Sequence, residues 1–131
     1  MKYVLVTGAY GGMGRKAVEV LRKHGFGVFA VDRNVGDSEE NVIPLRVDIT
    51  DTESVKDAAQ EVEKITDELY AIVHYAGIYM LDSLAETDSE SFERIFKVNL
   101  FGAFIINKIF LPFLRKGSKI VITTSELATL D

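Results

Sequence analysis

The 131-residue sequence has no cysteine, no excess of positive charge and no long hydrophobic run before Thr7. The absence of cysteine excludes disulfides and thiolate metal sites, so we assign no metal ligands and expect a reducing, cytoplasmic compartment. A formal net charge of −5, with 15 scattered basic residues, opposes non-specific attraction to nucleic acid. The apolar run at the amino terminus is too short for a signal-peptide core or a membrane span. We therefore expect neither a nucleic-acid partner nor a membrane partner.

Apolar runs of strand length alternate with helical periodicity along the whole sequence. This alternation is typical of βα units that build a parallel sheet, and the length suits one compact domain over residues 1–131. Crossovers in such units are right-handed, and the strand order reverses after the first strand. We therefore predict an α/β fold, a Rossmann-type doubly wound parallel sheet of order 3-2-1-4-5 in a three-layer αβα arrangement. The five expected strands are 3–7, 27–31, 42–47, 69–74 and 119–124.

Three helical segments are expected between these strands. The first follows a glycine-rich segment, and the second opens at Thr50-Asp51-Thr52-Glu53, which fits a capping box. A second capping box, Thr87-Asp88-Ser89-Glu90, opens a helix expected to run to about Leu114, with Pro112 bending or ending it. This last helix is apolar nearly all round from Leu100 onward, so something besides the sheet must cover it.

The glycine-rich segment Thr7-Gly8-Ala9-Tyr10-Gly11-Gly12-Met13-Gly14 lies between the first expected strand and the first expected helix. A pyrophosphate needs a tight turn, a close backbone approach and the amides of a helix N-terminus. Gly8, Gly12 and Gly14 suit those places, and Arg15 after Gly14 excludes a P-loop. The segment thus predicts a dinucleotide site, with a glycine-rich turn that binds nothing as the alternative. Its candidate cofactor-binding residues are Gly8, Tyr10, Gly12, Met13 and Gly14.

Asp32 ends the second expected strand. An acidic side chain at this place accepts hydrogen bonds from the adenosine ribose hydroxyls, which favours NAD. A 2′-phosphate would meet the negative charge of Asp32, although the neighbouring Arg33 is a compensating cation, so NADP is the less favoured cofactor. The alternative for Asp32 is a solvated loop carboxylate. Asp48 follows the third strand at the same edge of the sheet, either as a ligand contact or only as a helix-start residue.

Five segments, in order, resemble landmarks of the short-chain dehydrogenase/reductase family over the whole sequence. The segment from Thr7 to Gly14 resembles the family's cofactor motif, and Val47-Asp48-Ile49-Thr50 resembles its adenine-contacting segment. His74-Tyr75-Ala76-Gly77 falls where the family usually has Asn-Asn-Ala-Gly. Val98-Asn99 matches its helix asparagine, and Ile120 to Ser125 matches the strand that ends in its catalytic serine. The resemblance adds to the candidate cofactor-binding residues Asp48, Ile49, Ala76 and Gly77.

The resemblance implies hydride transfer between a nicotinamide and an alcohol or carbonyl substrate. In that reading Ser125 polarises the carbonyl, and Asn99 helps to hold a water that leads to the catalytic lysine. A tyrosine whose pKa is lowered by that lysine is the implied proton donor and acceptor. From the residues alone, Ser125 is otherwise an exposed strand end and Asn99 a buried amide bonded to backbone. His74 is a proton relay or, as we favour, a hydrogen-bonded structural histidine.

The family's Tyr-x-x-x-Lys motif is absent, because none of the five tyrosines has a lysine four residues later. We expect the sequence to be the N-terminal part of a full dehydrogenase and to be inactive alone, with a non-catalytic dinucleotide-binding module as the alternative. The spacing Gly8-x-x-Gly11-x-x-Gly14 also fits the extended branch, which includes nucleotide-sugar epimerases and dehydratases. We favour the ordinary branch because residues 91–102 resemble its long interface helix. We also expect a homodimer or, by the family resemblance, a homotetramer through helix 88–114, because the second apolar face of this helix would otherwise be exposed.

Overall fold

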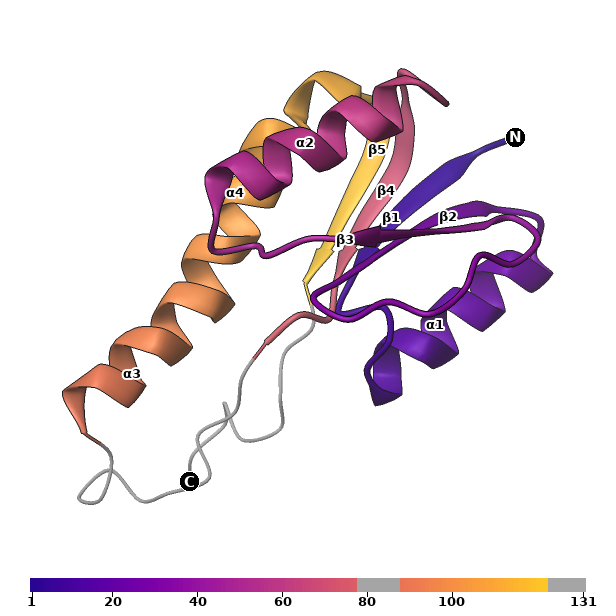
Figure 1. The fold of residues 1–131 in the computed structure, drawn as a ribbon. Helices are drawn as coiled ribbons and strands as arrows, with labels where there is room; N and C mark the ends of the chain where they lie inside the picture. Colours follow the sequence, from indigo (N-terminus) through magenta and orange to yellow (C-terminus); the bar gives the residue numbers. More distant parts are fainter. Residues whose placement is uncertain (78–87, 123–131) are drawn as a thin grey trace, which may run out of the picture.

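The computed structural model describes residues 1–77 and 88–122. Figure 1 shows a central twisted sheet with helices on both faces. All four strand pairs are parallel, and the order is β3-β2-β1-β4-β5, so the predicted Rossmann-type topology is confirmed. The strands are β1 (Tyr3–Thr7), β2 (Gly27–Asp32), β3 (Val42–Arg46), β4 (Leu69–His74) and β5 (Leu114–Ile122).

The central strands are apolar on both sides because helices cover both faces of the sheet. Helix α1 (Gly12–Lys23) covers one face, while α2 (Thr52–Glu63) and α4 (Gly102–Ile109) cover the other, as Figure 1 shows. Successive side chains of a strand point to opposite faces. In β1, accordingly, Leu5 belongs to the buried cluster under α2 and α4, and Val4 belongs to the buried cluster under α1.

The two predicted capping boxes are replaced by single aspartate caps. The Asp51 carboxylate accepts a hydrogen bond from the Glu53 backbone N at 3.0 Å, so Asp51 and not Thr50 caps α2. Thr50 is unavailable because its hydroxyl donates to the Asp48 carboxylate at 2.6 Å, a charge-assisted hydrogen bond. Asp88 likewise caps α3 (Ser89–Phe96). Thr87, the expected first residue of that box, lies outside the described residues.

The last helical segment is not the uniform helix expected to run to about Leu114. After α3 comes a π-helical turn, η1 (Lys97–Phe101), and then α4, which ends at Ile109. A short 3₁₀ turn, η2 (Leu111–Phe113), contains Pro112 and leads directly into β5 at Leu114. Proline lacks the N–H that an α-helix needs, and the helix ends just before it. Figure 1 shows α3 extending past the sheet at the ends of the strands.

Strand β5 begins earlier than expected, at Leu114 instead of Lys119. Its register with β4 shifts between the partners of Leu69 and Ala71, so the first part of the strand contains a bulge. Gly117 in this bulge has φ 93°, which is the left-handed region that favours glycine. No helix within residues 1–77 and 88–122 has the length and hydropathy needed to cross a membrane.

Candidate functional site

A cavity of about 320 Å³ lies at the carboxyl ends of the strands. In an open α/β sheet this edge, beside the point where the strand order reverses, is where ligands bind. The wall comes from the turn after β1, the ends of β2 and β3, the segment after β4, and the helical segment α3–η1. The predicted cofactor-binding residues that line it are Gly8, Asp32, Arg33, Asp48, Ile49, Ala76 and Gly77.

The turn between β1 and α1 is built so that only glycine fits two of its positions. Gly8 has φ 65°, and a Cβ there would lie 2.6 Å from the backbone N of Ala76. A Cβ on Gly14 would lie 1.9 Å from the carbonyl O of Gly8. A Cβ on Gly12, in contrast, would meet nothing within 4 Å. Gly8 and Gly14 therefore serve the protein's own packing, and Gly12 leaves open space at the start of α1.

The N-terminus of α1 suits an anion. Its N-cap is Gly11, which also lines the cavity and has no side chain to cap the first amides of the helix. The first turn contains no acidic residue. The uncapped amides and the positive end of the helix dipole thus favour a negatively charged group at this point.

Four predicted cofactor contacts do not line this cavity: Gly12 and Gly14, which lie in the first turn of α1, and the side chains of Tyr10 and Met13. The side chain of Met13 is 64% exposed and contributes to a shallow apolar surface with Ala17 and Val20 of α1. It points away because successive helical residues turn by about 100° around the axis. The Tyr10 ring lies in a separate hollow on the other side of the glycine turn, lined also by Gly36.

Asp32 holds the glycine turn in addition to facing the cavity. Its Oδ2 accepts a hydrogen bond from the backbone N of Tyr10 at 3.0 Å, and its Oδ1 accepts one from the backbone N of Arg33 at 2.7 Å. Asp32 is therefore not a solvated loop carboxylate. Each carboxylate oxygen has two lone pairs, so both retain capacity to accept from a ligand hydroxyl.

Asp48 lines the cavity at the end of β3 as an ionised carboxylate. The hydroxyl of Thr50, and then its backbone N–H, lower the pKa of Asp48 below its ordinary value by hydrogen bonding to Oδ1. No described residue donates a hydrogen bond to the other oxygen. Asp48 thus acts at the start of α2, as one of the two readings expected, and it also lies in the cavity wall with an oxygen that can accept a hydrogen bond.

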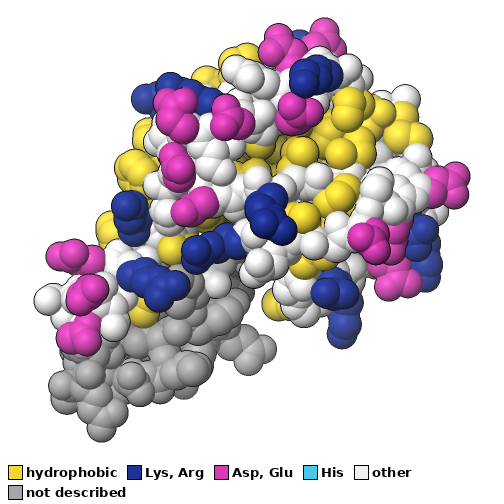
Figure 2. Space-filling model, viewed as in Figure 1, with side chains coloured by type: hydrophobic (Ala, Val, Ile, Leu, Met, Phe, Trp, Pro, Cys, Tyr) yellow, Lys and Arg dark blue, Asp and Glu magenta, His cyan; other side chains and the backbone are white. Residues whose placement is uncertain are grey.

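Basic side chains surround these two carboxylates. Arg33 and Arg94 line the cavity, and the charges of Arg33 and Lys97 contribute to the lowered pKa of Asp48. Figure 2 shows several basic side chains between the middle of the molecule and α3. A diphosphate entering here meets cations, while neutral hydroxyls meet Asp32 and Asp48.

Thr7 connects the end of β1 to the segment after β4. Its hydroxyl oxygen accepts from the backbone N of Ala76 at 3.2 Å and lies 3.4 Å from Nδ1 of the buried His74. Nε2 of His74 lies 2.7 Å from Oδ1 of Asn107, which accepts if the proton is on Nε2. Burial lowers the pKa of His74, partly offset by the hydrogen bond to Asn107. These contacts favour the structural histidine over the proton relay.

Of the two predicted catalytic residues, Asn99 and Ser125, the structure describes only Asn99. Asn99 lies in the π-helical turn η1, and its Oδ1 is 3.2 Å from the position that a Cβ on Gly77 would take. Asn99 is exposed, which does not fit a buried amide, and the neighbouring Val98 is the residue of this turn that lines the cavity. Ser125 lies outside the described residues.

The sequence reasoning missed Thr7, Gly11 and Arg94. Arg94 and Val98, four residues apart on one face of the helical segment, both line the cavity. Their spacing was a usable signal, because residues at i and i+4 share a face. Nothing in the sequence marked Thr7 as the residue that would bond to Ala76, which is 69 positions away.

The fold defines a Rossmann-type protein, and its cavity lies at the carboxyl edge of the sheet, where ligands bind in such folds. The family model described as short chain dehydrogenase matches residues 2–130, and the chain belongs to that family. The resemblance seen in the sequence is therefore confirmed.

Relatives and solved structures agree with this assignment. Estradiol 17-beta-dehydrogenase 2 of Mus musculus is 37% identical over 138 residues, which cover 96% of this chain and 36% of that protein. The NADPH-dependent 1-acyldihydroxyacetone phosphate reductase of Schizosaccharomyces pombe is 28% identical, covering 98% of this chain and 45% of that protein. A glucose/ribitol dehydrogenase structure from Brucella melitensis superposes with a TM-score of 0.90 at 25% identity, covering 97% and 57% of the two chains. The chain thus spans between a third and three fifths of the length of these proteins.

Proposed function

We propose that the chain is the dinucleotide-binding part of a cytoplasmic, NAD-dependent oxidoreductase that acts on an alcohol or carbonyl substrate. The observation that carries this proposal is the meeting of the glycine turn, the uncapped start of α1 and Asp32 at one cavity. When bound, NAD supplies a nicotinamide that accepts or donates a hydride. The residues present fit such a group, because open space at Gly12 adjoins helix amides that suit a pyrophosphate.

The cavity residues divide into an adenosine side and a nicotinamide side. We assign the pyrophosphate to the turn from Gly8 to Gly12 and the adenosine ribose to Asp32. Asp48 and Ile49 then bind the adenine, and Ala76 and Gly77 lie on the nicotinamide side. Gly14 and Thr7 act through the backbone that they hold in place, since their contacts are with the protein itself.

Asp32 supports NAD over NADP. Its carboxylate accepts from hydroxyl groups and repels a 2′-phosphate, and the Schizosaccharomyces pombe relative shows that family membership alone does not choose the cofactor. Titration calorimetry should give a lower Kd for NAD than for NADP. Asp32→Ala should narrow the difference, and Asp51→Ala, a carboxylate outside the cavity, should leave it unchanged. Equal Kd values in the unmodified protein would refute the assignment of Asp32.

For catalysis we propose that Ser125 orients the substrate carbonyl and that Asn99 helps to hold a water in the proton path. By the family resemblance the proton donor is a tyrosine in a Tyr-x-x-x-Lys motif, which residues 1–131 do not contain. Loss of a general acid typically lowers the rate ~10²–10⁴-fold, so these residues alone should be inactive.

The test compares the 131-residue chain with the natural protein including any continuation. NADH absorbance is followed against a panel of secondary alcohols and ketones. Activity that requires the continuation and disappears with Ser125→Ala would support an enzyme. Rapid turnover by the 131 residues would contradict the proposal, and tight NAD binding without turnover in either form would favour a binding module.

A further inference from the structure

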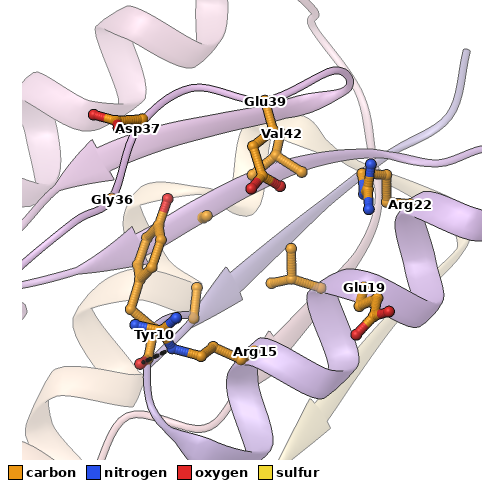
Figure 3. Close-up of a pocket in the computed structure, with 11 residues that line it drawn as sticks. Tyr10, Arg15, Glu19, Arg22, Gly36, Asp37, Glu39 and Val42 are labelled. Atoms are coloured by element: carbon orange, nitrogen blue, oxygen red, sulfur yellow. Dashed lines mark hydrogen bonds between the residues drawn. The ribbon is translucent and has the colours of Figure 1, made fainter.

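A second hollow, of about 500 Å³, lies between α1 and the segment that joins β2 to β3. It is separated from the cofactor cavity by the glycine turn. Figure 3 shows the Tyr10 ring rising from that turn toward Gly36, with Arg15 beside its base and Glu39 on the far wall. Tyr10 therefore reaches across the hollow from the glycine turn to the segment that contains Gly36.

Packing holds the Tyr10 ring in place. The ring packs against the buried cluster under α1, and a Cβ on Gly36 would lie 3.0 Å from its Cε1. The hydroxyl is buried and finds no hydrogen-bond partner among the described residues. Burial also raises the pKa of Tyr10, partly offset by the nearby Gly36 backbone. The useful part of the side chain is therefore the ring.

The backbone of Tyr10 makes the contact with the cofactor site. Its N–H donates to Oδ2 of Asp32 at 3.0 Å, and its carbonyl accepts from Nε of Arg15 at 2.9 Å. The Arg15 guanidinium also lies 5.9 Å from the centre of the Tyr10 ring. One residue thus contacts the carboxylate assigned to the ribose, the first turn of α1 and, through Gly36, the segment after β2.

We propose that Tyr10 is a positioning residue for the adenosine half of the dinucleotide. Its ring holds the segment around Gly36 against the glycine turn, and its N–H fixes one oxygen of Asp32. The Asp32 carboxylate is thereby held in its binding orientation before the dinucleotide binds. This inference rests on the proposed function, because it takes the adenosine ribose to be the group that Asp32 receives.

The first test is the Kd of NAD and of NADP in Tyr10→Ala and Tyr10→Phe. Tyr10→Ala should weaken NAD binding about tenfold, the effect of losing ~1.4 kcal/mol of preorganisation. NADP, which gains little from Asp32, should weaken less, so the preference for NAD should shrink. Tyr10→Phe keeps the ring and should leave both Kd values within about twofold of the unmodified protein.

The matched control is Tyr70→Ala. Tyr70 packs against the same buried cluster and pairs with Phe26 at 5.3 Å, but it lies near the opposite end of β4. It should lower the melting temperature without changing the ratio of the two Kd values. A purely structural role for Tyr10 predicts the same behaviour for Tyr10→Ala, and that result would overturn the inference.

A second variant tests the contact itself and does not need Tyr10→Ala to be stable on its own. Gly36→Ala should push the ring or the segment by a few tenths of an ångström and raise the Kd of NAD about threefold. In the Tyr10→Phe background, which keeps the ring, Gly36→Ala should raise the Kd of NAD by the same factor. Combined with Tyr10→Leu, which has no ring, Gly36→Ala should have no further effect. Additive effects in that pair would overturn the inference. An unmodified protein that binds neither nucleotide would instead overturn the proposed function, and this inference with it.

Discussion

At the scale of single residues, the glycine turn contains two kinds of glycine. Gly8 and Gly14 are required by contacts inside the protein, since a Cβ on either would overlap backbone atoms. Gly12 has open space around its Cα and is required only if a ligand comes close. The sequence placed all three in the motif but did not separate these roles, because the contact of Gly8 depends on how the segment after β4 approaches, and the contact of Gly14 depends on how the turn folds back onto α1.

This difference predicts opposite outcomes for two substitutions of the same kind. Gly12→Ala should keep the melting temperature and weaken NAD binding, because its methyl group occupies the place assigned to the pyrophosphate. Gly14→Ala should lower the stability by about 3 kcal/mol or more, because backbone must move to admit the Cβ. Thermal unfolding and NAD titration of both variants test this. Loss of stability in Gly12→Ala would contradict the assignment.

A second prediction concerns the buried His74. Burial lowers the pKa of His74 below its ordinary value of 6.5, so the unfolded chain binds the proton more readily than the folded chain. The stabilisation is complete above pH 6.5 and is lost as the pH falls through the lowered pKa. Urea unfolding at about pH 8 and about pH 5.5 should therefore show a lower free energy of unfolding at the acidic pH.

His74→Gln should reduce this pH difference, whatever it does to the absolute stability. The shifted carboxyl group at the cavity, Asp48, has a pKa lowered from 3.8 and is ionised at both pH values. The control is His24→Gln, which removes the other histidine at the exposed end of α1. An unchanged pH difference in His74→Gln would show that another group causes it.

At the scale of secondary structure, hydrophobic periodicity predicted the strands and their order well. β1, β2 and β4 are buried on both faces, and continuous apolar runs are a strong signal for such strands. The π-helical turn at Lys97–Phe101 was not predicted, because one extra residue in a turn leaves the apolar pattern of a helix almost unchanged. The bulge in β5 was missed for a related reason: it depends on pairing with β4 and not on the local sequence.

The cap of α2 supplies the prediction at this scale. Asp51→Ala removes the side-chain acceptor for the Glu53 backbone N–H and should lower the free energy of unfolding by about 1 kcal/mol. Asp57→Ala, an exposed aspartate within the same helix, is the control and should not lower it. Urea denaturation measures both. Equal losses would show that the cap is dispensable.

At the scale of the whole molecule, a stripe of apolar side chains along α3, η1 and α4 is exposed. Phe92, Phe96, Leu100 and Phe104 recur every four residues and are each more than half exposed, at 52%, 55%, 57% and 54%. Phe92 and Phe96 stack on one another at 6.2 Å. A contiguous apolar surface of this kind marks an interface.

We propose that this stripe packs against a second copy of the chain, as the basis of a dimer or tetramer. Light scattering of the natural protein should give the molar mass of a dimer or a larger oligomer. Phe96→Ser should lower the molar mass toward that of a monomer. Val20→Ser on α1 is the matched control, because Val20 is 54% exposed but lies on another helix. A monomeric natural protein, or equal effects of the two variants, would contradict the proposal.

The strand order also determines which part of the sheet can form first while the protein is being synthesised. β1, β2 and β3 are neighbours in both sequence and sheet, so residues 3–46 contain all three strands of this half of the sheet, although α2 and α4, which cover one of its faces, come later. The other edge of β1 waits for β4, whose His74 aligns with Thr7. At about 5–20 residues per second, the ribosome takes on the order of seconds to synthesise the residues between β3 and the end of β4. Until then the half-sheet has an open edge, and the turn around Gly8 lacks the Ala76 backbone against which it closes.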